Sequence, residues 1–183
     1  MVMRKKIKKK IIILGGASLL SYLWCNEVSD EFEIYLVNNL QTTRYLKFPV
    51  LKVDLNSSSQ FASLLEIYKI DIVVNTIGLT NVENCEADPD KAYFLNSILP
   101  GKIAKACFLA GKKLIHISTD HFYSDQIKIH TEEDKVSLVN IYAKSKYEGE
   151  INVLDNLSSA LICRTNFFGY GPPHKKSFSD WII

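Results

Sequence analysis

The chain has 183 residues, of which 47% are hydrophobic and 23% are charged, and its formal net charge is +2. This composition is that of one globular domain with enough apolar residues for a core, so it excludes a disordered or collagen-like chain. The basic residues Arg4 to Lys6 and Lys8 to Lys10 indicate a solvated arm over residues 1–10, and no basic surface for nucleic acid is indicated beyond it.

The apolar run over residues 11–20 has two interpretations. After a basic start it resembles the first part of a signal peptide, and Cys25 would then suggest a lipoprotein. However, the bulky Trp24 stands where a processing site needs a small residue, and the run is too short to span a bilayer. We therefore expect a strand, a turn and a helix here, and no membrane segment.

Six short segments rich in Ile, Val and Leu predict six strands. They are residues 11–14, 34–37, 50–53, 72–77, 114–117 and 160–163. Most of them lack polar alternation and helical segments separate most of them, which is typical of parallel strands that are covered on both faces. The fold class is therefore expected to be α/β, a doubly wound (Rossmann) parallel sheet with helices on both faces, over residues 11–183.

Four helices are predicted from apolar spacing and capping residues. The first follows Ser18, and the others span about 58–68, 90–110 and 140–154. Pro100 predicts a bend in the third of these helices because proline has no N–H to donate.

The segment after the first predicted strand is similar to a phosphate-binding loop. Gly15 and Gly16 are followed by Ser18 and Ser21, which fits the pattern G-x-x-G-x-x-G only if the serines replace its second and third glycines. Each serine adds a Cβ atom where the pattern leaves room for a pyrophosphate or for close helix packing. These four residues are expected to form the cofactor-binding loop, with binding that is weakened or lost. The alternative is that the segment is an ordinary glycine turn between a strand and a helix.

The choice of nucleotide depends on the end of the second predicted strand. Asn38 and Asn39 follow it, whereas NAD sites usually have an Asp or Glu there to bind the ribose 2′-hydroxyl. Arg44 is near enough in sequence to meet a 2′-phosphate. The sequence thus favours NADPH over NADH.

Four further residues near the predicted sheet edge are candidates for cofactor contacts. Asp54 is placed to meet the adenine amino group. The segment that runs from Asn75 to Gly78 is placed so that its backbone lies close to a sugar of the cofactor. Asn96, in the third predicted helix, is placed to hydrogen-bond across the sheet end. Strand-end caps and core packing are the alternative roles.

Tyr142 and Lys146 lie one turn apart in the last predicted helix. Residues at i and i+4 share a helix face, so the ammonium would lie beneath the phenol and lower its pKa by up to about three units. Such a phenol is suited to donate a proton to a carbonyl during its reduction. With nine tyrosines in a lysine-rich chain the spacing also arises by chance, so its significance depends on its surroundings.

Two hydroxyl groups, on Ser118 and Thr119, follow the fifth predicted strand. Because ligands gather at the carboxyl ends of parallel strands, either hydroxyl would hold a substrate oxygen near the tyrosine. His121 and Asn166 are further candidates for substrate contact, whereas His116 in mid-strand is expected to be structural.

The four cysteines are expected to be buried, reduced thiols. They lie in or beside apolar sequence and form no C-x-x-C pair, and the four residues are Cys25, Cys85, Cys107 and Cys163. This pattern favours a cytoplasmic protein and indicates no metal site.

Four segments carry a resemblance to a known family, and they are residues 71–86, 92–96, 116–120 and 142–150. In order and spacing they resemble the extended short-chain dehydrogenase/reductases, and among these the dTDP-4-dehydrorhamnose reductases. The resemblance implies Tyr142 as proton donor, Lys146 as the residue that lowers its pKa and holds the nicotinamide ribose, and Thr119 as the hydroxyl that orients the sugar carbonyl. It also implies NADPH-dependent reduction of the 4-keto group of a nucleotide-linked deoxysugar for polysaccharide synthesis.

The chain departs from this family in three places. The phosphate loop has its two serines, the residues after Asp120 run His121 to Asp125 instead of beginning with tyrosine, and the chain stops at Ile183. Family members continue for about another hundred residues, so the substrate lobe is expected to be largely absent here. A non-catalytic nucleotide-binding or regulatory protein and a nucleotide-sugar epimerase or dehydratase are therefore alternatives. The expected partner is a nucleotide sugar, and a homodimer is left open.

Overall fold

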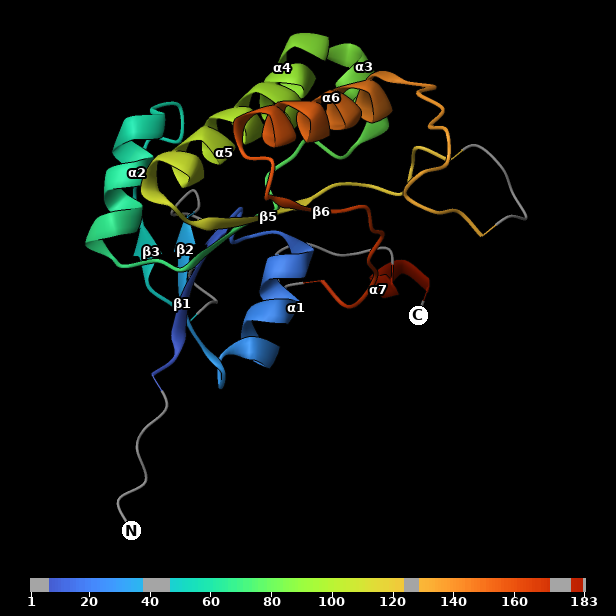
Figure 1. Ribbon diagram of the computed structural model, residues 1–183. Helices are drawn as coiled ribbons and strands as arrows, with labels where there is room; N and C mark the ends of the chain where they lie inside the picture. The colour runs from blue at the N-terminus through green and yellow to red at the C-terminus, as the bar shows by residue number, and fades with distance from the viewer. Residues whose placement is uncertain (1–6, 38–46, 124–128, 172–178, 183) are drawn as a thin grey trace.

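The computed structural model describes residues 7–37, 47–123, 129–171 and 179–182. Six parallel strands form one sheet in the order β3-β2-β1-β4-β5-β6 (Figure 1). Their bounds are β1 Lys9–Leu14, β2 Phe32–Val37, β3 Val50–Leu51, β4 Ile72–Asn75, β5 Lys113–Ile117 and β6 Leu161–Cys163. Strand order reverses beside β1, which creates the crevice where ligands bind in doubly wound sheets. The predicted fold class is confirmed.

Helices lie on both faces of the sheet. Their bounds are α1 Leu19–Val28, α2 Ser58–Ile67, α3 Val82–Ala87, α4 Pro89–Tyr93, the π-helix η1 Phe94–Ile98, α5 Leu99–Ala110, α6 Ile141–Asn156 and α7 Ser179–Ile182. In Figure 1, α2, α5 and α6 cover one face and α1 covers the other. No helix in the described part of the chain is both long and apolar enough to cross a membrane.

Strand β1 shows why the predicted strands lack polar alternation. Ile12 packs in the core beneath α2, α5 and α6, whereas Ile11 and Ile13 pack with Cys25 of α1. Successive strand residues point to opposite faces, so a strand covered on both sides needs apolar residues throughout. Strand β1 begins at Lys9, two residues before the predicted boundary, and the basic residues 1–6 lie outside the described part.

The predicted bend near Pro100 takes the form of the π-helical turn η1, between α4 and α5. Pro100 has no N–H to donate to the carbonyl of Asn96, four residues before it, and such a gap favours local rearrangement of a helix. Helix α6 passes directly over this turn. A Cβ atom added to Gly149 would lie 2.0 Å from the Asn96 carbonyl oxygen, so only glycine allows this approach.

Candidate active site

A cavity of about 470 Å³ opens at the carboxyl ends of the central strands. Its wall includes the first residues of α1, the loop after β4, the residues after β5 and the first turns of α6. The candidates that line it are Ser18, Gly78, Ser118, Thr119, His121, Tyr142, Lys146 and Asn166. Three candidate groups far apart in sequence, for phosphate, substrate and proton transfer, therefore meet at one cavity.

Tyr142 lies in the first turn of α6, whose start is fixed by two contacts. Asn140 caps the helix by accepting from the Ala143 amide at 2.8 Å, and Glu86 accepts from the Ile141 amide at 2.8 Å. Capping side chains satisfy amides that would otherwise have no helical partner. The helix therefore starts in a defined place, with the phenol at the cavity.

The pKa of Tyr142 is raised, chiefly because burial disfavours the phenolate, and the Thr119 hydroxyl opposes this shift. The direction predicted from the sequence, a pKa lowered by Lys146, is wrong for this structure. The reason is that burial and the nearby Cys85 and Asp120 favour the neutral phenol. The phenol is consequently protonated at neutral pH, which is the form that donates a proton.

Lys146 is only 4% exposed, and its ammonium donates to the carbonyl oxygen of Ile117 at 2.7 Å. Burial lowers its pKa to about 8, against the opposing effect of Glu150. The lysine thus links α6 to the end of β5 and brings a positive charge to the cavity wall.

Ser118 and Thr119 follow β5 and are both buried. Within the described residues the Ser118 hydroxyl has no hydrogen-bond partner, although it lines the cavity. The Thr119 hydroxyl accepts from the His121 amide at 3.1 Å. A buried hydroxyl without a partner is costly unless a ligand or water satisfies it, so Ser118 is suited to bind a ligand oxygen.

His121 lies beside the phenol. Its ring centre is 5.9 Å from that of Tyr142, and its Nε2 is 3.3 Å from the Asn140 side-chain nitrogen. The imidazole is exposed. This position fits the predicted substrate contact, and Asn166 lines the same cavity.

The phosphate loop accommodates both of its serines. Gly15 has φ +84°, a left-handed conformation that favours glycine, and Ser18 caps α1 by accepting from the Ser21 amide at 3.1 Å. Ser21 is fully buried, and its hydroxyl donates to the Gly15 carbonyl at 3.1 Å. The serines therefore fold inward to stabilise the turn. Gly16 packs against Leu36.

Of the eight predicted cofactor contacts, Ser18 and Gly78 line the cavity; besides the loop residues Gly15, Gly16 and Ser21, three others do not, and these are Asp54, Asn75 and Asn96. Asp54 is exposed and accepts from the Asn56 amide at 2.9 Å, which makes it a turn-forming residue. Asn75 is buried, accepts from the Ile77 amide at 3.1 Å and lies 3.1 Å from His116 Nδ1. Burial lowers the pKa of His116 well below its usual value, so this histidine is neutral and structural, as expected.

Asn96 is the third of these residues, and it holds other parts of the site in place. Its side chain accepts from the Leu79 amide at 2.7 Å and donates to the Leu79 carbonyl at 3.0 Å and to Ser145 at 3.0 Å. It therefore ties the loop after β4 to α6. Gly78 lies between them, where an added Cβ atom would be 3.0 Å from Asn96 Oδ1 and 3.9 Å from Lys146 Nζ. Arg44, Asn38 and Asn39, which bear on the choice of nucleotide, lie outside the described residues.

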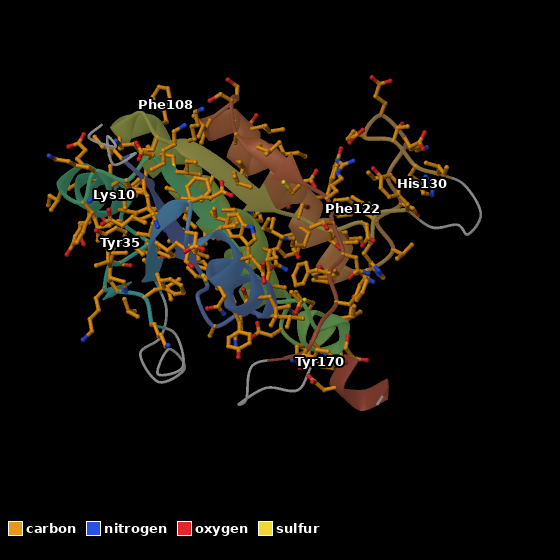
Figure 2. All side chains as sticks on the ribbon, turned by 90° about the horizontal axis from the view of Figure 1, so that it is seen from below. Lys10, Tyr35, Phe108, Phe122, His130 and Tyr170 are labelled. Atoms are coloured by element: carbon orange, nitrogen blue, oxygen red, sulfur yellow. The ribbon has the colours of Figure 1, made fainter. Side chains whose placement is uncertain are left out.

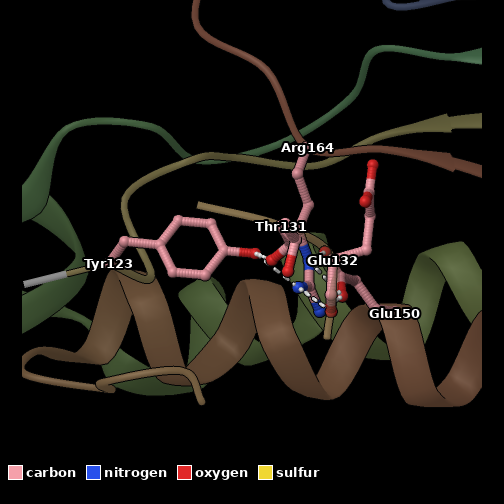
Figure 3. A network of polar contacts seen from close by, with 5 residues as sticks. All are labelled: Tyr123, Thr131, Glu132, Glu150 and Arg164. Atoms are coloured by element: carbon pink, nitrogen blue, oxygen red, sulfur yellow. Dashed lines mark hydrogen bonds and ion pairs between the residues drawn. The ribbon is translucent and has the colours of Figure 1, made fainter. Parts of the chain in front are cut away.

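Sequence reasoning missed the pairing of Arg164 and Glu150 (Figure 3). The guanidinium makes two contacts of 3.1 Å and one of 2.7 Å with the carboxylate, and it also donates to the Tyr123 hydroxyl at 2.9 Å. Phe122, next to α6 in Figure 2, packs beneath it with the guanidinium 5.2 Å from the ring centre. This network joins β6, α6 and the loop after β5. Arginine after the last strand was the available signal, but its partner could not be assigned from sequence.

The sheet, the glycine turn after β1 and the pair Tyr142 and Lys146 beside Thr119 define a dinucleotide-fold protein of the short-chain dehydrogenase/reductase class. A family model described as the RmlD substrate binding domain matches residues 9–182, and the chain belongs to this family. The resemblance inferred from the sequence is confirmed.

Three similar proteins illustrate the family. A probable low-salt glycan biosynthesis reductase from Haloferax volcanii is 32% identical over 139 residues, which cover 73% of this chain and 46% of the relative. The methionine adenosyltransferase 2 subunit beta of Mus musculus is 32% identical over 160 residues, covering 85% of this chain and 46% of the relative. The dTDP-4-dehydrorhamnose reductase of Bacillus anthracis, solved in complex with NADP, superimposes with a TM-score of 0.75 at 26% identity. That superposition covers 92% of this chain and 58% of the solved one, so the chain spans about half the length of the relatives.

Proposed function

We propose that this chain carries the cofactor-binding and proton-donating part of an NADPH-dependent reductase that acts on the 4-keto group of a nucleotide-linked deoxysugar. The observation that carries the proposal is the convergence of Tyr142, Lys146 and Thr119 on the cavity that also reaches Ser18 of the phosphate loop. A proton donor, a cation and hydroxyl groups beside a phosphate-binding turn are the parts that carbonyl reduction needs.

The residues present fit a dinucleotide. The start of α1 can bind a pyrophosphate through helix amides, and Gly15 supplies the left-handed conformation that the turn requires. Gly78 lies at the cavity wall, and Lys146, which lines the same cavity, would hold a ribose hydroxyl of the bound dinucleotide. The unpartnered Ser118 hydroxyl is available to a substrate oxygen.

When bound, NADPH supplies a hydride from its nicotinamide ring. Tyr142 then gives its phenolic proton to the substrate oxygen that gains negative charge, while Ser118 and Thr119 hold that oxygen in place. Lys146 stabilises the phenolate left behind, because its charge lies on the same face of α6 one turn further along. His121 at the cavity mouth contacts the sugar.

The preference for NADPH rests on the absence of an acidic residue after β2 and on Arg44. It is supported by the NADP that is bound in the B. anthracis reductase. The dTDP-4-dehydrorhamnose reductases among the relatives support a nucleotide-sugar substrate.

A regulatory protein is the second candidate. It is favoured by the similarity to the methionine adenosyltransferase 2 subunit beta, which extends over 85% of this chain. The two candidates differ in turnover: a regulatory protein binds nucleotide without reducing a keto-sugar, whereas the reductase oxidises NADPH when the sugar is added.

The deciding experiment is a titration of the chain with NADPH and NADH, followed by nicotinamide fluorescence. Gly16→Val is the disrupting variant, since even a Cβ atom there would lie 3.2 Å from Leu36 Cβ. Ala87→Val, at an exposed residue of α3, is the control. Micromolar NADPH binding that Gly16→Val abolishes and Ala87→Val retains supports the proposal. Binding of neither nucleotide by the wild-type chain contradicts it. NADPH oxidation on adding a dTDP-4-keto-6-deoxyhexose then separates the reductase from the regulatory protein.

A further inference from the structure

Three hydroxyl groups meet behind the phosphate loop, on Ser18, Ser21 and Thr76. Ser18 Oγ lies 2.8 Å from Ser21 Oγ and 3.0 Å from Thr76 Oγ1, and the latter two oxygens are 3.2 Å apart. Two of these residues occupy the positions where the phosphate-loop pattern has glycine. The third belongs to the loop after β4, on the neighbouring strand, so the cluster joins two segments that both border the cavity.

Counting protons assigns the direction of these hydrogen bonds. Thr76 Oγ1 donates to the Leu14 carbonyl at 2.8 Å, and Ser21 Oγ donates to the Gly15 carbonyl at 3.1 Å, because a carbonyl oxygen can only accept. The protons of Thr76 and Ser21 are thus committed to the backbone. With both of those protons on carbonyl oxygens, the Ser18 proton is the one left for the cluster, and it serves one of the three oxygen–oxygen contacts at a time. Ser18 Oγ also accepts from the Ser21 amide.

This assignment has a consequence for ligand binding. The Ser18 hydroxyl cannot donate to a phosphate without giving up its bond inside the cluster. Phosphate recognition therefore falls to backbone amides at the start of α1, whose positions depend on the shape of the turn. The two serines act on this shape, and Ser18 Oγ itself takes up the Ser21 amide.

Thr76 is the centre of the cluster. Its amide and its hydroxyl both donate to the Leu14 carbonyl, at 3.0 and 2.8 Å, and its hydroxyl is also 3.2 Å from the Gly15 carbonyl. The turn packs so closely on it that a Cβ atom at Gly15 would lie 2.7 Å from Thr76 Oγ1. Thr76 thus contacts both glycine and serine positions of the loop from outside it.

We propose that Thr76 is a positioning residue for the cofactor: its hydroxyl, with those of Ser18 and Ser21, holds the phosphate loop in the shape that glycines would otherwise permit. This inference rests on the proposed function, because it takes the pyrophosphate of NADPH as the ligand of the loop. The hydroxyl network itself is a property of the chain without any ligand. The two can consequently be tested separately.

The test compares the wild-type chain with Thr76→Val, which removes the hydroxyl and keeps the shape, and with Thr76→Ser, which keeps the hydroxyl. Thr131→Val, on an exposed residue after β5, is the matched control. Amide hydrogen exchange is measured over residues 14–22, together with the thermal midpoint and the dissociation constant for NADPH. We expect the amides of this segment to exchange about tenfold faster in Thr76→Val, and the variant to bind NADPH about tenfold more weakly. The reason is that the substitution removes a buried hydroxyl and leaves the groups that contact it without that hydrogen bond.

We also expect Thr76→Ser to restore the exchange rate and the NADPH affinity, and Thr131→Val to match the wild-type chain in both. Unchanged exchange over residues 14–22 in Thr76→Val overturns the inference, as does faster exchange spread through the whole chain with a lowered thermal midpoint. Faster loop exchange with unchanged NADPH affinity overturns the positioning role. If the wild-type chain binds no NADPH, the proposed function and the positioning role fail together, while the exchange data still decide whether the hydroxyl network holds the loop.

Discussion

The ammonium of Lys146 donates a 2.7 Å hydrogen bond to the carbonyl oxygen of Ile117, and this bond joins helix α6 to the end of strand β5. The residues directly after Ile117 are Ser118 and Thr119, so the bond fixes the distance between the candidate proton donor and the candidate oxygen-binding hydroxyls. This arrangement buries the charged ammonium, which is unfavourable. Burial therefore lowers the pKa of Lys146 to about 8.

Stability should therefore depend on pH through Lys146. An unfolded lysine has a pKa of about 10.4, so between about pH 8 and 10.4 the unfolded chain binds a proton that the folded chain has released. The free energy of unfolding due to this residue consequently rises with pH across that window, by about 3 kcal/mol as an order of magnitude. Below pH 8 both states are protonated and the full cost of burial is present.

The measurement is urea denaturation of the wild-type chain and Lys146→Met from pH 7 to 10.5. Cysteines and tyrosines titrate in both proteins, so their effects cancel in the difference between the two. We expect the stability of the wild type relative to Lys146→Met to increase with pH. Parallel pH profiles would show that the lysine is not buried as a cation.

Removing the phenolic hydroxyl with Tyr142→Phe should lower kcat for keto-sugar reduction at least about 100-fold, because only the proton donor is lost. The dissociation constant for NADPH should stay within about twofold, since the phenol contributes no charge at neutral pH. Both quantities are measured by NADPH absorbance and fluorescence, with Tyr68→Phe, at the C-cap of α2 and away from the cavity, as control. Turnover at the wild-type rate in Tyr142→Phe would sink the assignment of the proton donor.

The sheet could be predicted from sequence because most of its strands are largely apolar, as expected where helices cover both faces. The same reasoning located the hydroxyls after β5 and the tyrosine of α6, since strand ends in a parallel sheet share one edge. Helix α3 was missed: it is a single short helix whose first turn depends on the Asn81 cap.

Side-chain direction was the part that sequence could not supply. Asp54, Asn75 and Asn96 do lie near the predicted edge, but their polar groups bond to the backbone around them. The pKa of Tyr142 was predicted in the wrong direction for a related reason. Helical spacing reveals that Lys146 is near, but burial, which decides the sign, depends on the whole fold.

The crossing of α6 over η1 should be intolerant of any side chain at Gly149. An alanine there would place Cβ 2.0 Å from the carbonyl oxygen of Asn96, which cannot retreat without moving the π-helical turn. We expect Gly149→Ala to lower the free energy of unfolding by about 2 to 3 kcal/mol, although alanine is about 1 kcal/mol better than glycine within a helix.

Thermal and urea denaturation measure this effect. Gly101→Ala is the matched control, because an added Cβ atom there would lie 3.2 Å from Asn152 Cβ, between α5 and α6 and next to the crossing. A Gly149→Ala chain as stable as the wild type would contradict the close crossing. Reduced NADPH turnover in any folded Gly149→Ala protein would follow from displacement of Tyr142, earlier on the same helix.

The pairing of Arg164 with Glu150 should be costly to break from one side. The Glu150 side chain is only 6% exposed, so Arg164→Met leaves a buried carboxylate without its cation and should cost about 3 to 5 kcal/mol of stability. Replacing both, in Arg164→Met with Glu150→Leu, removes the uncompensated charge and should restore much of that loss.

The exposed pair of Lys10 and Glu33 (3.3 Å), with Lys10 marked in Figure 2, provides the control for this experiment. Its side chains are 30% and 47% exposed, so water screens the charges and Lys10→Met should change stability far less than Arg164→Met does. Urea denaturation of the four proteins at pH 7 gives the comparison. If Arg164→Met is no less stable than the double variant, the guanidinium does not compensate a buried charge, and the loop after β5 must be held to α6 by the packing of Phe122 instead.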